Sequence, residues 1–515
     1  MKILIAVIIL LMLFICPGVQ AATIIYVPMD DRPVNLDYVL KSVKAAGHEI
    51  IAPPIGLIAG REHSGDVQQL WQWVLDNSTM SDALVLSSDA LLYGGLVPSR
   101  THLLGERVLE ERLQRFRELR TKVPGQKIYV LGTVMRTAKM SVGATEPSYY
   151  EKFGPKIFRI TAIEDKSGNV GISNSEKNEL KELLMLVPPE YMKDWRSRRA
   201  KNFQINLFLL QWVRDGIIDF LLFGRDDSSP FSASHQEGSH LEIAGKDLGS
   251  NHYLSTPGAD NLGMSLVVKA INDLSFSLPF VKLFYAPGAG GDTVASYEER
   301  PLSETILQHV LATGGLKTDW TDKPDLILAV NTPKSGITAE ASGSENITKA
   351  KPATKQFVLR VISELDVGRR VAVGDVAFAN GADNALMNEF SSKQVLDRLA
   401  AYAGWNTAGN TLGYALGQGM LAISTPDPLR KNVLAVRYLD DWAYQANIRS
   451  QLINELVYPR GGDGLWLNEL KPLLTSEAQK RIRRFAGRHL WPINSEAIDV
   501  DFPWNRMFEL RVNVR

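Results

Sequence analysis

Cysteine is almost absent from this chain of 515 residues, since Cys16 is the only one. Residues 1–21 have the features of a signal peptide: a lysine precedes an apolar stretch, and Val19-Gln20-Ala21 has the small-x-small form of a signal-peptidase site. Cleavage after Ala21 removes Cys16, so the mature chain is expected to have no disulfide, no catalytic thiol and no cysteine-ligated zinc. We therefore predict an exported protein, located in the periplasm, in the cell envelope or outside the cell.

The chain also lacks a long apolar run at its start. The stretch Ile3–Ile15 has 13 residues, whereas a helix needs about 20 apolar residues to cross a bilayer. We expect no stable membrane anchor after cleavage. Two alternatives are an uncleaved anchor and a lipid on Cys16, although Ile15 is too large for the position before a lipidated cysteine.

An excess of basic residues is missing as well. Lys and Arg number 57, Asp and Glu number 57, and the formal net charge is zero. Proteins that bind nucleic acid usually carry a basic surface, so we expect no nucleic-acid partner. No repeat or low-complexity tract stands out, and no sequence feature indicates the oligomeric state. The 22% charged and 45% hydrophobic content is that of an ordinary globular protein.

Short apolar segments recur at roughly 25–45 residue intervals, with helical patterns between them. The nine strand candidates are residues 23–27, 49–52, 83–86, 127–132, 217–222, 281–285, 325–330, 370–373 and 399–403. This rhythm predicts a parallel α/β fold, most simply a (β/α)8 TIM-like barrel, with one strand peripheral or the barrel irregular. A doubly wound open parallel sheet is the alternative.

The predicted domain organisation follows from this rhythm. Residues 22–424 form the α/β barrel, and residues 138–189 form a loop-rich insertion after the fourth strand, suited to a lid. Residues 425–515 form a C-terminal helical extension that ends in a strand.

The stretch Phe223–Ser232 (FGRDDSSPFS) marks the place where a buried strand ends and polar chemistry begins. Two carboxylates held close repel each other, so we predict that Asp226 or Asp227 keeps a proton as general acid while the other acts as base or orients substrate. Neighbouring side chains in a strand point to opposite faces, so both can serve only if the chain leaves strand geometry at Gly224. The alternative is a structural cluster in which Arg225 neutralises both carboxylates.

Polar residues follow most of the other strand candidates in the same way, and the carboxyl ends of parallel strands meet at one edge. The predicted substrate-binding residues are Asp30, Asp31, Arg32, Asp89, Arg225, His235, Asp292, Asp375, Trp405, Asn406 and Asn410. Turns, helix caps and a core tryptophan are the alternatives for several of them. Residues 503–506 are expected to reach back to this edge.

A metal site is the weaker interpretation of the histidines. The spacing of His235, Glu237 and His240 matches no standard zinc motif. We therefore predict no cofactor and keep a bound metal ion as the alternative.

Four motifs together resemble a bacterial family known only as a domain of unknown function, number four thousand one hundred and twenty-seven in its series. They are residues 28–33, 88–91, 224–227 and 404–407, and the resemblance extends over nearly the whole mature chain. It implies no established activity, so the functional prediction rests on the residues.

The predicted function is that of a secreted hydrolase acting on a glycan, most simply a glycosidase whose acid/base pair is Asp226 and Asp227. Adjacent aspartates after a barrel strand resemble hexosaminidases that use the acetamido group of their substrate. A carbohydrate or cell-envelope polymer is then the expected partner. The alternatives are a non-catalytic glycan-binding protein of the envelope and a metal-dependent hydrolase. The metal ligands of the latter are Asp30, Asp89, Asp226, His235 and His240.

Overall fold

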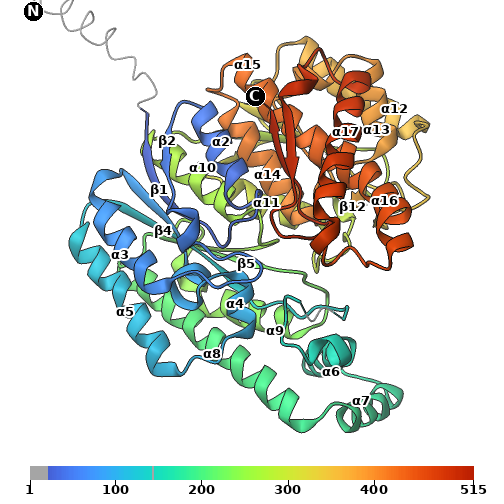
Figure 1. The fold of residues 1–515 in the computed structure, drawn as a ribbon. Coiled ribbons are helices and arrows are strands. Elements are labelled where there is room, and N and C mark those ends of the chain that lie inside the picture. The colour runs from blue at the N-terminus through green and yellow to red at the C-terminus, as the bar shows by residue number, and fades with distance from the viewer. Residues whose placement is uncertain (1–20, 142–143, 515) are drawn as a thin grey trace, which may run out of the picture.

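The computed structural model describes residues 21–141 and 144–514, and most strands of these residues lie in two open parallel sheets (Figure 1). Four short strands form two further sheets of two strands each. The first sheet has the order β2-β1-β3-β4-β5-β6, and the second has the order β13-β11-β9-β7-β8. The strands of the first sheet are β1 (Thr23–Val27), β2 (Glu49–Ile51), β3 (Ala83–Ser87), β4 (Lys127–Val134), β5 (Phe220–Arg225) and β6 (Tyr253–Pro257). Those of the second sheet are β7 (Phe280–Tyr285), β8 (Leu316–Lys317), β9 (Leu326–Asn331), β11 (Val371–Asp375) and β13 (Ala401–Ala403).

The (β/α)8 barrel is not confirmed, because each sheet has two free edges among the described residues. In a barrel the strands follow one another around a closed ring, whereas here the order reverses at β1 and again at β7. Reversal of the strand order is the mark of a doubly wound open sheet. The alternative prediction is therefore nearer to the structure, although it foresaw one large sheet and the described residues form two.

Helices cover both faces of the first sheet, as the alternation of its side chains requires. On one face α2 (Asp37–Ala45) and α10 (Leu262–Leu274) pack on residues such as Tyr26 and Val85. On the other face the adjacent residues, such as Leu84, pack on three helices. These helices are α3 (Val67–Asn77), α5 (Glu106–Lys122) and α8 (Pro189–Arg214).

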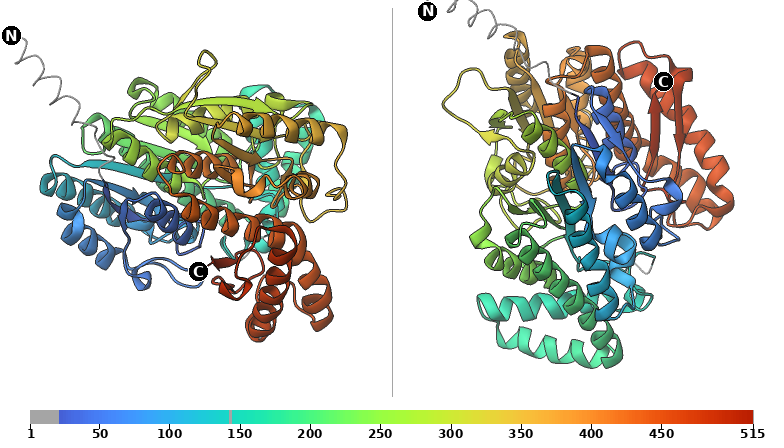
Figure 2. Two further views of the ribbon diagram at one scale, coloured as in Figure 1. Left: turned by 90° about the horizontal axis from the view of Figure 1, so that it is seen from above. Right: turned by 90° about the vertical axis from the view of Figure 1, so that its left-hand side faces the viewer.

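The second sheet is covered in the same manner. Its inner face packs on α11 (Leu302–Ala312) and α14 (Ala408–Leu421), and its outer face packs on α12 (Pro352–Asp366) and α13 (Asn384–Ser392). The inner helices α10 and α14 lie against each other, so one hydrophobic core runs from the first sheet to the second. Two views of the ribbon at right angles show this stacking (Figure 2).

Glycines on α14 allow this close helix contact. A Cβ atom at Gly417 would lie 2.5 Å from Cγ of Met264, and one at Gly413 would lie 2.3 Å from the side-chain nitrogen of Asn261. Because such distances are far shorter than van der Waals contact, a larger residue at either position would push α10 and α14 apart. The two sheets are thereby held as neighbours in one body.

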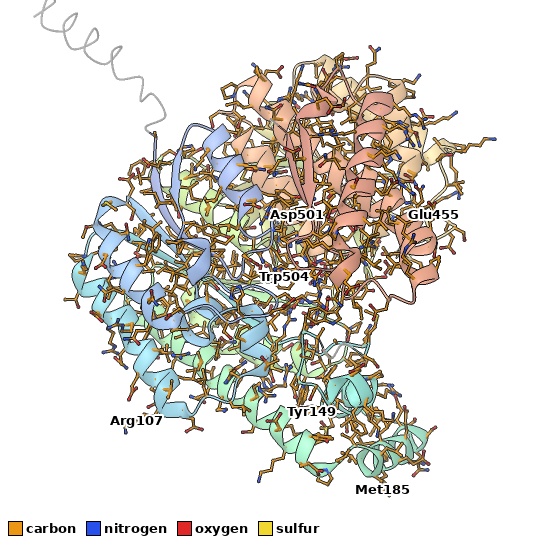
Figure 3. The ribbon with its side chains drawn as sticks, in the orientation of Figure 1. Arg107, Tyr149, Met185, Glu455, Asp501 and Trp504 are labelled. Carbon is orange, nitrogen blue, oxygen red and sulfur yellow. The ribbon has the colours of Figure 1, made fainter. Side chains whose placement is uncertain are left out.

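The residues of the predicted insertion form a helical hairpin rather than loops, and their role as a lid stays a prediction. Its helices α6 (Tyr150–Asn169) and α7 (Asn174–Leu186) follow β4 and project from the body at the bottom of Figure 1. Ser173 and Glu176 form a capping box that starts α7. The tip is exposed, and Met185, labelled in Figure 3, has 79% of its surface accessible. The α6 helix packs against α9 (Ala233–Ala244), which follows the Asp226–Asp227 loop.

The C-terminal residues are helical and end in a strand, as predicted, and they pack on the two sheets. Helix α15 (Asp427–Arg437) contacts α2 and β13, and the π-type helix η7 (Tyr438–Ile448) joins the outer core of the second sheet. Further helices are the π-type η3 (Asp89–Tyr93), α4 (Leu96–Thr101), α16 (Arg449–Leu452), η8 (Ile453–Val457) and α17 (Lys471–His489), besides short 3-10 turns. The remaining strands are β10 (Ala339–Glu340), β12 (Phe378–Ala379), β14 (Ile498–Asp501) and β15 (Arg511–Val514).

The predicted signal peptide lies outside the described residues except for Ala21, so its cleavage stays a prediction. Among the residues that the structure does describe, no helix combines the length and the apolar character that crossing a membrane requires.

Candidate functional site

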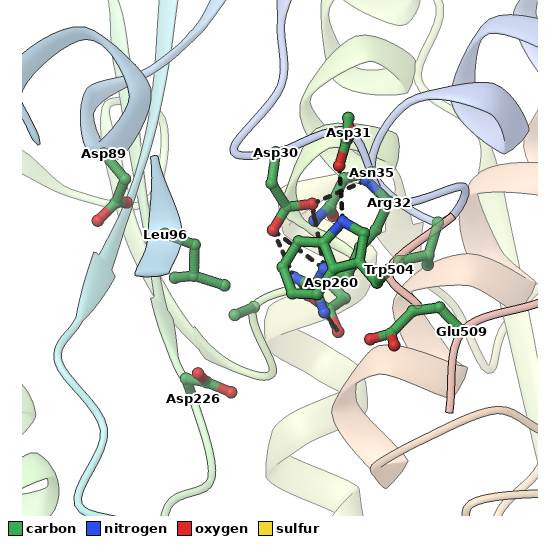
Figure 4. Close-up of polar contacts among 12 residues, drawn as sticks. Asp30, Asp31, Arg32, Asn35, Asp89, Leu96, Asp226, Asp260, Trp504 and Glu509 are labelled. Carbon is green, nitrogen blue, oxygen red and sulfur yellow. Dashed lines mark hydrogen bonds and ion pairs between the residues drawn. The ribbon is translucent and has the colours of Figure 1, made fainter. Parts of the chain in front are cut away.

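Loops from both sheets meet at the carboxyl ends of the strands, around Arg32. This residue follows β1, whereas its partner Asp260 follows β6 and Asn406 follows β13 of the second sheet. Figure 4 shows the cluster of Asp30, Arg32 and Asp260, with Asp226 pointing toward it from the loop after β5. The structure therefore brings together polar residues that lie up to 376 positions apart in the chain.

Arg32 is the centre of a buried ion-pair cluster. Its two terminal nitrogens hold the carboxylate of Asp260 at 2.6 and 3.1 Å, and its Nε donates to Asp30 at 3.0 and 3.1 Å. Arg32 is 6% exposed, and both carboxylates are more than 90% buried. Such two-pronged contacts fix the geometry as well as neutralising charge, so the cluster ties the end of β1 to the end of β6.

Within this cluster, Asp260 has a raised pKa. Burial raises the pKa of Asp260 to about 6; the Arg32 charge opposes the shift, and the charges of Asp226 and Asp30 add to it. Asn410, at the start of α14, holds the loop in place because its side-chain oxygen accepts the backbone N–H groups of residues 259, 260 and 261. Asn406 donates to Asp260 at 3.1 Å. The role of Asn410 is therefore to position Asp260.

Asp226 and Asp227 are held by two arginines, neither of them Arg225. Arg100, on α4, donates to Asp226, and Arg136, just after β4, donates to Asp227 at 2.8 Å. The side chains of Asp226 and Asp227 remain 15% and 27% exposed. Each carboxylate thus has a charged partner on one side and access to solvent on the other.

Glu146 links these two arginines from the insertion. Its carboxylate accepts a hydrogen bond of 2.6 Å from Arg136 and lies 3.6 Å from Arg100. Because Glu146 neutralises part of the arginine charge, Asp226 and Asp227 are not fully compensated. Burial, followed by the charge of Asp226, raises the pKa of Asp227, while Arg136 and Arg100 oppose the shift.

The backbone explains how adjacent side chains can act at one place. Strand β5 continues through Gly224 to Arg225, so the chain does not leave strand geometry at the glycine as predicted. It turns instead at Asp227, whose φ of +44° lies in the left-handed region that few residues other than glycine adopt. Both carboxylates then lie within electrostatic range of both Arg100 and Arg136.

The C-terminal segment 503–506 does reach this site. The indole nitrogen of Trp504 donates to Asp31 at 2.6 Å, and the Arg32 guanidinium lies 5.0 Å from the Trp504 ring. Burial raises the pKa of Asp31, and the hydrogen bond from Trp504 opposes the shift. The end of the chain therefore forms one wall of the site.

Asp89 lies in the wall of the same region, 2% exposed, and accepts hydrogen bonds of 3.0 Å from the backbone and the hydroxyl of Thr133. Burial raises the pKa of Asp89 to about 6, against the effect of these hydrogen bonds. Trp405 is buried as well and packs on Phe508, so its ring offers no open platform to a sugar. For these residues the structure favours positioning roles.

Four predicted site residues point elsewhere. Arg225 is fully buried and pairs with Glu242 and Glu299, not with the aspartates that follow it. His235 Nδ1 lies 2.6 Å from Asp165 on α6. Asp292 is exposed on the short turn after β7, and Asp375 lies buried at the end of β11 in a separate cluster of the second sheet.

No three His, Cys, Asp or Glu side chains of residues 21–141 and 144–514 come together in a way that could hold a metal ion. In particular, His235 is bonded to Asp165, and His240 is exposed beside Phe203. The five ligands considered in the sequence therefore do not form one group.

Asp260, Arg100 and Arg136 belong to the site but were not among the predicted site residues. Asp260 lies in the loop after β6, a strand that the sequence pattern did not reveal because Ser255 and Thr256 interrupt its apolar run. Arg100 lies within a helix, where an arginine usually faces solvent. Arg136 follows a strand candidate that the sequence did reveal, and this position could have marked it as a site residue.

Glu298 is a buried carboxyl group whose protonation should affect how the free energy of unfolding depends on pH. Burial, with the neighbouring charge of Glu299, raises the pKa of Glu298 to about 8 from 4.5, although the backbone N–H of Gly409 donates to it. The folded protein thus keeps a proton that the unfolded chain loses near pH 4.5. The contribution of Glu298 to the free energy of unfolding is therefore fully present below pH 4.5. It falls by about 1.4 kcal/mol per pH unit between pH 4.5 and pH 8.

We expect the Glu298→Gln variant to lose this slope, because glutamine stays neutral and can still accept the Gly409 hydrogen bond. Urea unfolding at pH 5, 6, 7 and 8 measures the change, with the free energy of unfolding of the variant falling less steeply than that of the wild type. Glu304→Gln, an exposed change on α11, serves as the matched control. Parallel curves for wild type and Glu298→Gln would contradict the assignment.

A family model described as a protein of unknown function, DUF4127, matches residues 24–513. No curated protein and no solved structure matches the chain. The match covers both sheets and the C-terminal segment that carries Trp504.

Proposed function

We propose that this chain, which belongs to the DUF4127 family of proteins of unknown function, is a glycoside hydrolase. The observation that carries the proposal is the pair Asp226 and Asp227. These two carboxylates lie partly exposed at a strand end, and each is held by an arginine. The pKa of Asp227 is raised. Glycosidases need one carboxyl group that is protonated and a second group that is ionised. A glycan of the cell envelope is the proposed substrate, in keeping with the predicted export.

Asp227 is proposed as the general acid. Its raised pKa favours the protonated form, and its 27% exposed side chain can reach a bound substrate. In the proposed step, its proton moves to the glycosidic oxygen as the bond from that oxygen to the anomeric carbon breaks. The proton is regained when water attacks the anomeric carbon in the second step.

Asp226 is proposed to hold the acetamido group of an N-acetylated sugar. Its carboxylate can accept the acetamido N–H, which turns the acetamido oxygen toward the anomeric carbon. That oxygen then forms a bond to the carbon as the leaving group departs, and water breaks this bond afterwards. Arg100 keeps Asp226 in place for this task. Asp31 and Asn406, both half-buried at the same edge, are proposed to bind sugar hydroxyls.

Turnover of aryl N-acetylglucosaminides and of peptidoglycan fragments by the purified mature protein tests the proposal. Release of the aryl group or of shorter glycans supports a hydrolase. Binding of the fragments without any turnover would replace the proposal with the glycan-binding alternative.

The pH dependence gives a test specific to Asp227. Arg136 lowers the pKa of Asp227, so the change Arg136→Gln should raise that pKa. Because the acid must be protonated, kcat/KM falls as the pH rises through this pKa, and the alkaline limb should move to higher pH in the variant. Arg159→Gln, in the α6–α7 hairpin and paired with Glu179, is the matched control and should leave the profile unchanged. An unmoved limb in a folded Arg136→Gln protein would remove Asp227 from the acid role.

A further inference from the structure

A cavity of about 820 Å³ lies at the carboxyl end of the second sheet, apart from the proposed catalytic pair. It is lined by residues at the ends of three strands: 286–287 after β7, 331–335 from the last residue of β9 onward and 377–378 after β11. The volume is in the range of small-molecule sites. None of the residues proposed above for glycan hydrolysis lines it.

The cavity lies at the point where the strand order of this sheet reverses. The chain leaves β7 for α11 on the inner face and leaves β9, the next strand in the sheet, for α12 on the outer face. The two loops therefore diverge and open a crevice between them. In open α/β sheets this is the position at which ligands bind.

The N-terminus of α12 forms one side of the cavity. Pro352 occupies the first turn, and Ala353 and Thr354, which follow it, also line the cavity. The first backbone N–H groups of a helix have no partner within it, and no side chain caps this end. The neighbouring α13 differs, because Asp383 caps it by accepting the N–H groups of Ala385 and Leu386. Of these two helix ends, that of α12 is the one without a side-chain cap, and the helix dipole favours an anion there.

Cations surround the same place. Lys334, Lys349 and Lys351 line the cavity, and none of the three has an ion pair within the described part of the chain. Glu345 and Asp383 lie on the lining too, so the cavity combines three positive groups with two acidic ones. A ligand that carries both an anionic group and hydroxyl groups suits this arrangement.

A buried hydroxyl without a partner gives independent support. Thr332 directly follows β9 and lines the cavity; it is 5% exposed, and its hydroxyl has no hydrogen-bond partner among the described residues. Leaving a buried hydroxyl unpaired is costly, and a molecule bound in the cavity beside Thr332 would supply the missing partner.

The base of the cavity is rigidly held by Asp375. Asn331 donates to Asp375 at 2.8 Å and to Asp383 at 3.1 Å, and Asp375 also accepts the Asp383 backbone N–H and the Tyr402 hydroxyl. Asp375 is therefore a positioning residue of this second cavity.

We propose that this cavity binds a phosphate monoester of a hydroxylated small molecule. The phosphate group lies at the N-terminus of α12 beside Lys351 and Lys349, and the hydroxylated part lies toward Thr332 and Asn331. Sugar phosphates and nucleotides share this chemistry. The site is independent of the proposed hydrolase activity, so Asp226 and Asp227 variants should bind the phosphate ester normally.

Calorimetric titration of the purified mature protein tests this. The probes are glucose 6-phosphate, AMP, inorganic phosphate and glucose. Saturable binding of either ester, with no binding of glucose, is the expected result, and the ester that binds identifies the source. The Lys351→Ala variant should bind that ester about tenfold more weakly, as for the loss of one charge-assisted hydrogen bond. Thr332→Val, nearly the same in shape, should weaken binding several-fold with an unchanged melting temperature.

Lys355→Ala is the matched control, since Lys355 is exposed on α12 but does not line the cavity. It removes the same charge and should leave the affinity unchanged. The proposal is overturned if neither ester binds at millimolar concentration, or if only inorganic phosphate binds. Equal affinity of the Lys351→Ala and Thr332→Val proteins with the wild type would overturn it as well.

Discussion

Replacing Asp227 by asparagine is expected to lower kcat on N-acetylated glycosides by about 10²–10⁴-fold, the usual contribution of a general acid. Asparagine keeps the shape of the side chain and can still bond to Arg136, but it carries no proton for the leaving oxygen. The deficit should depend on the substrate. A dinitrophenyl glycoside, whose leaving group needs no proton, should be cleaved by Asp227→Asn much more nearly at the wild-type rate.

Asp226→Asn should also lose about 10²–10⁴-fold, yet without rescue by a better leaving group, because its proposed task is to orient the acetamido group. The two variants thus separate the two roles. Asp215→Asn, an exposed change at the end of α8, is the control. Wild-type turnover together with full activity of both folded variants would remove the pair from the mechanism.

The change Arg32→Met is expected to destabilise the fold by about 3–5 kcal/mol, because it leaves two buried carboxylates without their cation. Arg32 is the shared partner of Asp30 and Asp260 and joins β1 to β6. The loss should be smaller at pH 5 than at pH 8. Asp260, whose pKa is already raised to about 6 beside Arg32, takes up a proton more readily once the guanidinium is gone.

Urea unfolding at the two pH values measures this loss. Arg107→Met is the matched control: Arg107 is 91% exposed and pairs with Glu111 on the surface, so its loss should cost at most about 1 kcal/mol. Adding Asp260→Asn to Arg32→Met should recover part of the stability, since it removes one unpaired charge. A cost for Arg32→Met no larger than that of the control would show that the cluster contributes little to folding.

All nine strand candidates correspond to strands in the structure, because a fully buried strand is marked by a local run of apolar residues. Strands β6 and β8 of the two large sheets were missed: Ser255, Thr256 and Pro257 make β6 look like a loop, and β8 has only two residues. The same local signal cannot tell which strands pair. Five of the nine candidates lie in the first sheet and four in the second, and a barrel and two open sheets show the same strand and helix rhythm.

The position of the site was partly accessible from the sequence. Asp30, Arg32 and Asp226 follow apolar runs and do meet at the strand ends, as expected for parallel strands. Asp375 shows the limit of this argument. It also follows a strand, yet that strand belongs to the second sheet, where Asp375 supports a different cavity. The rule identifies an edge of a sheet, but it does not say how many sheets there are.

The sequence by itself determined that the chain is α/β, where most strands lie and which polar residues end them, because burial and backbone preference act over a few residues. The tertiary structure decided which charges meet. Asp226 finds Arg100 at a separation of 126 residues, and Trp504 finds Asp31 at 473. These residues become neighbours because α10 packs on α14 and because of the order of the strands in each sheet. The protonation of Asp227 depends on the same packing, since burial and distant charges, rather than its own neighbours in sequence alone, set its pKa.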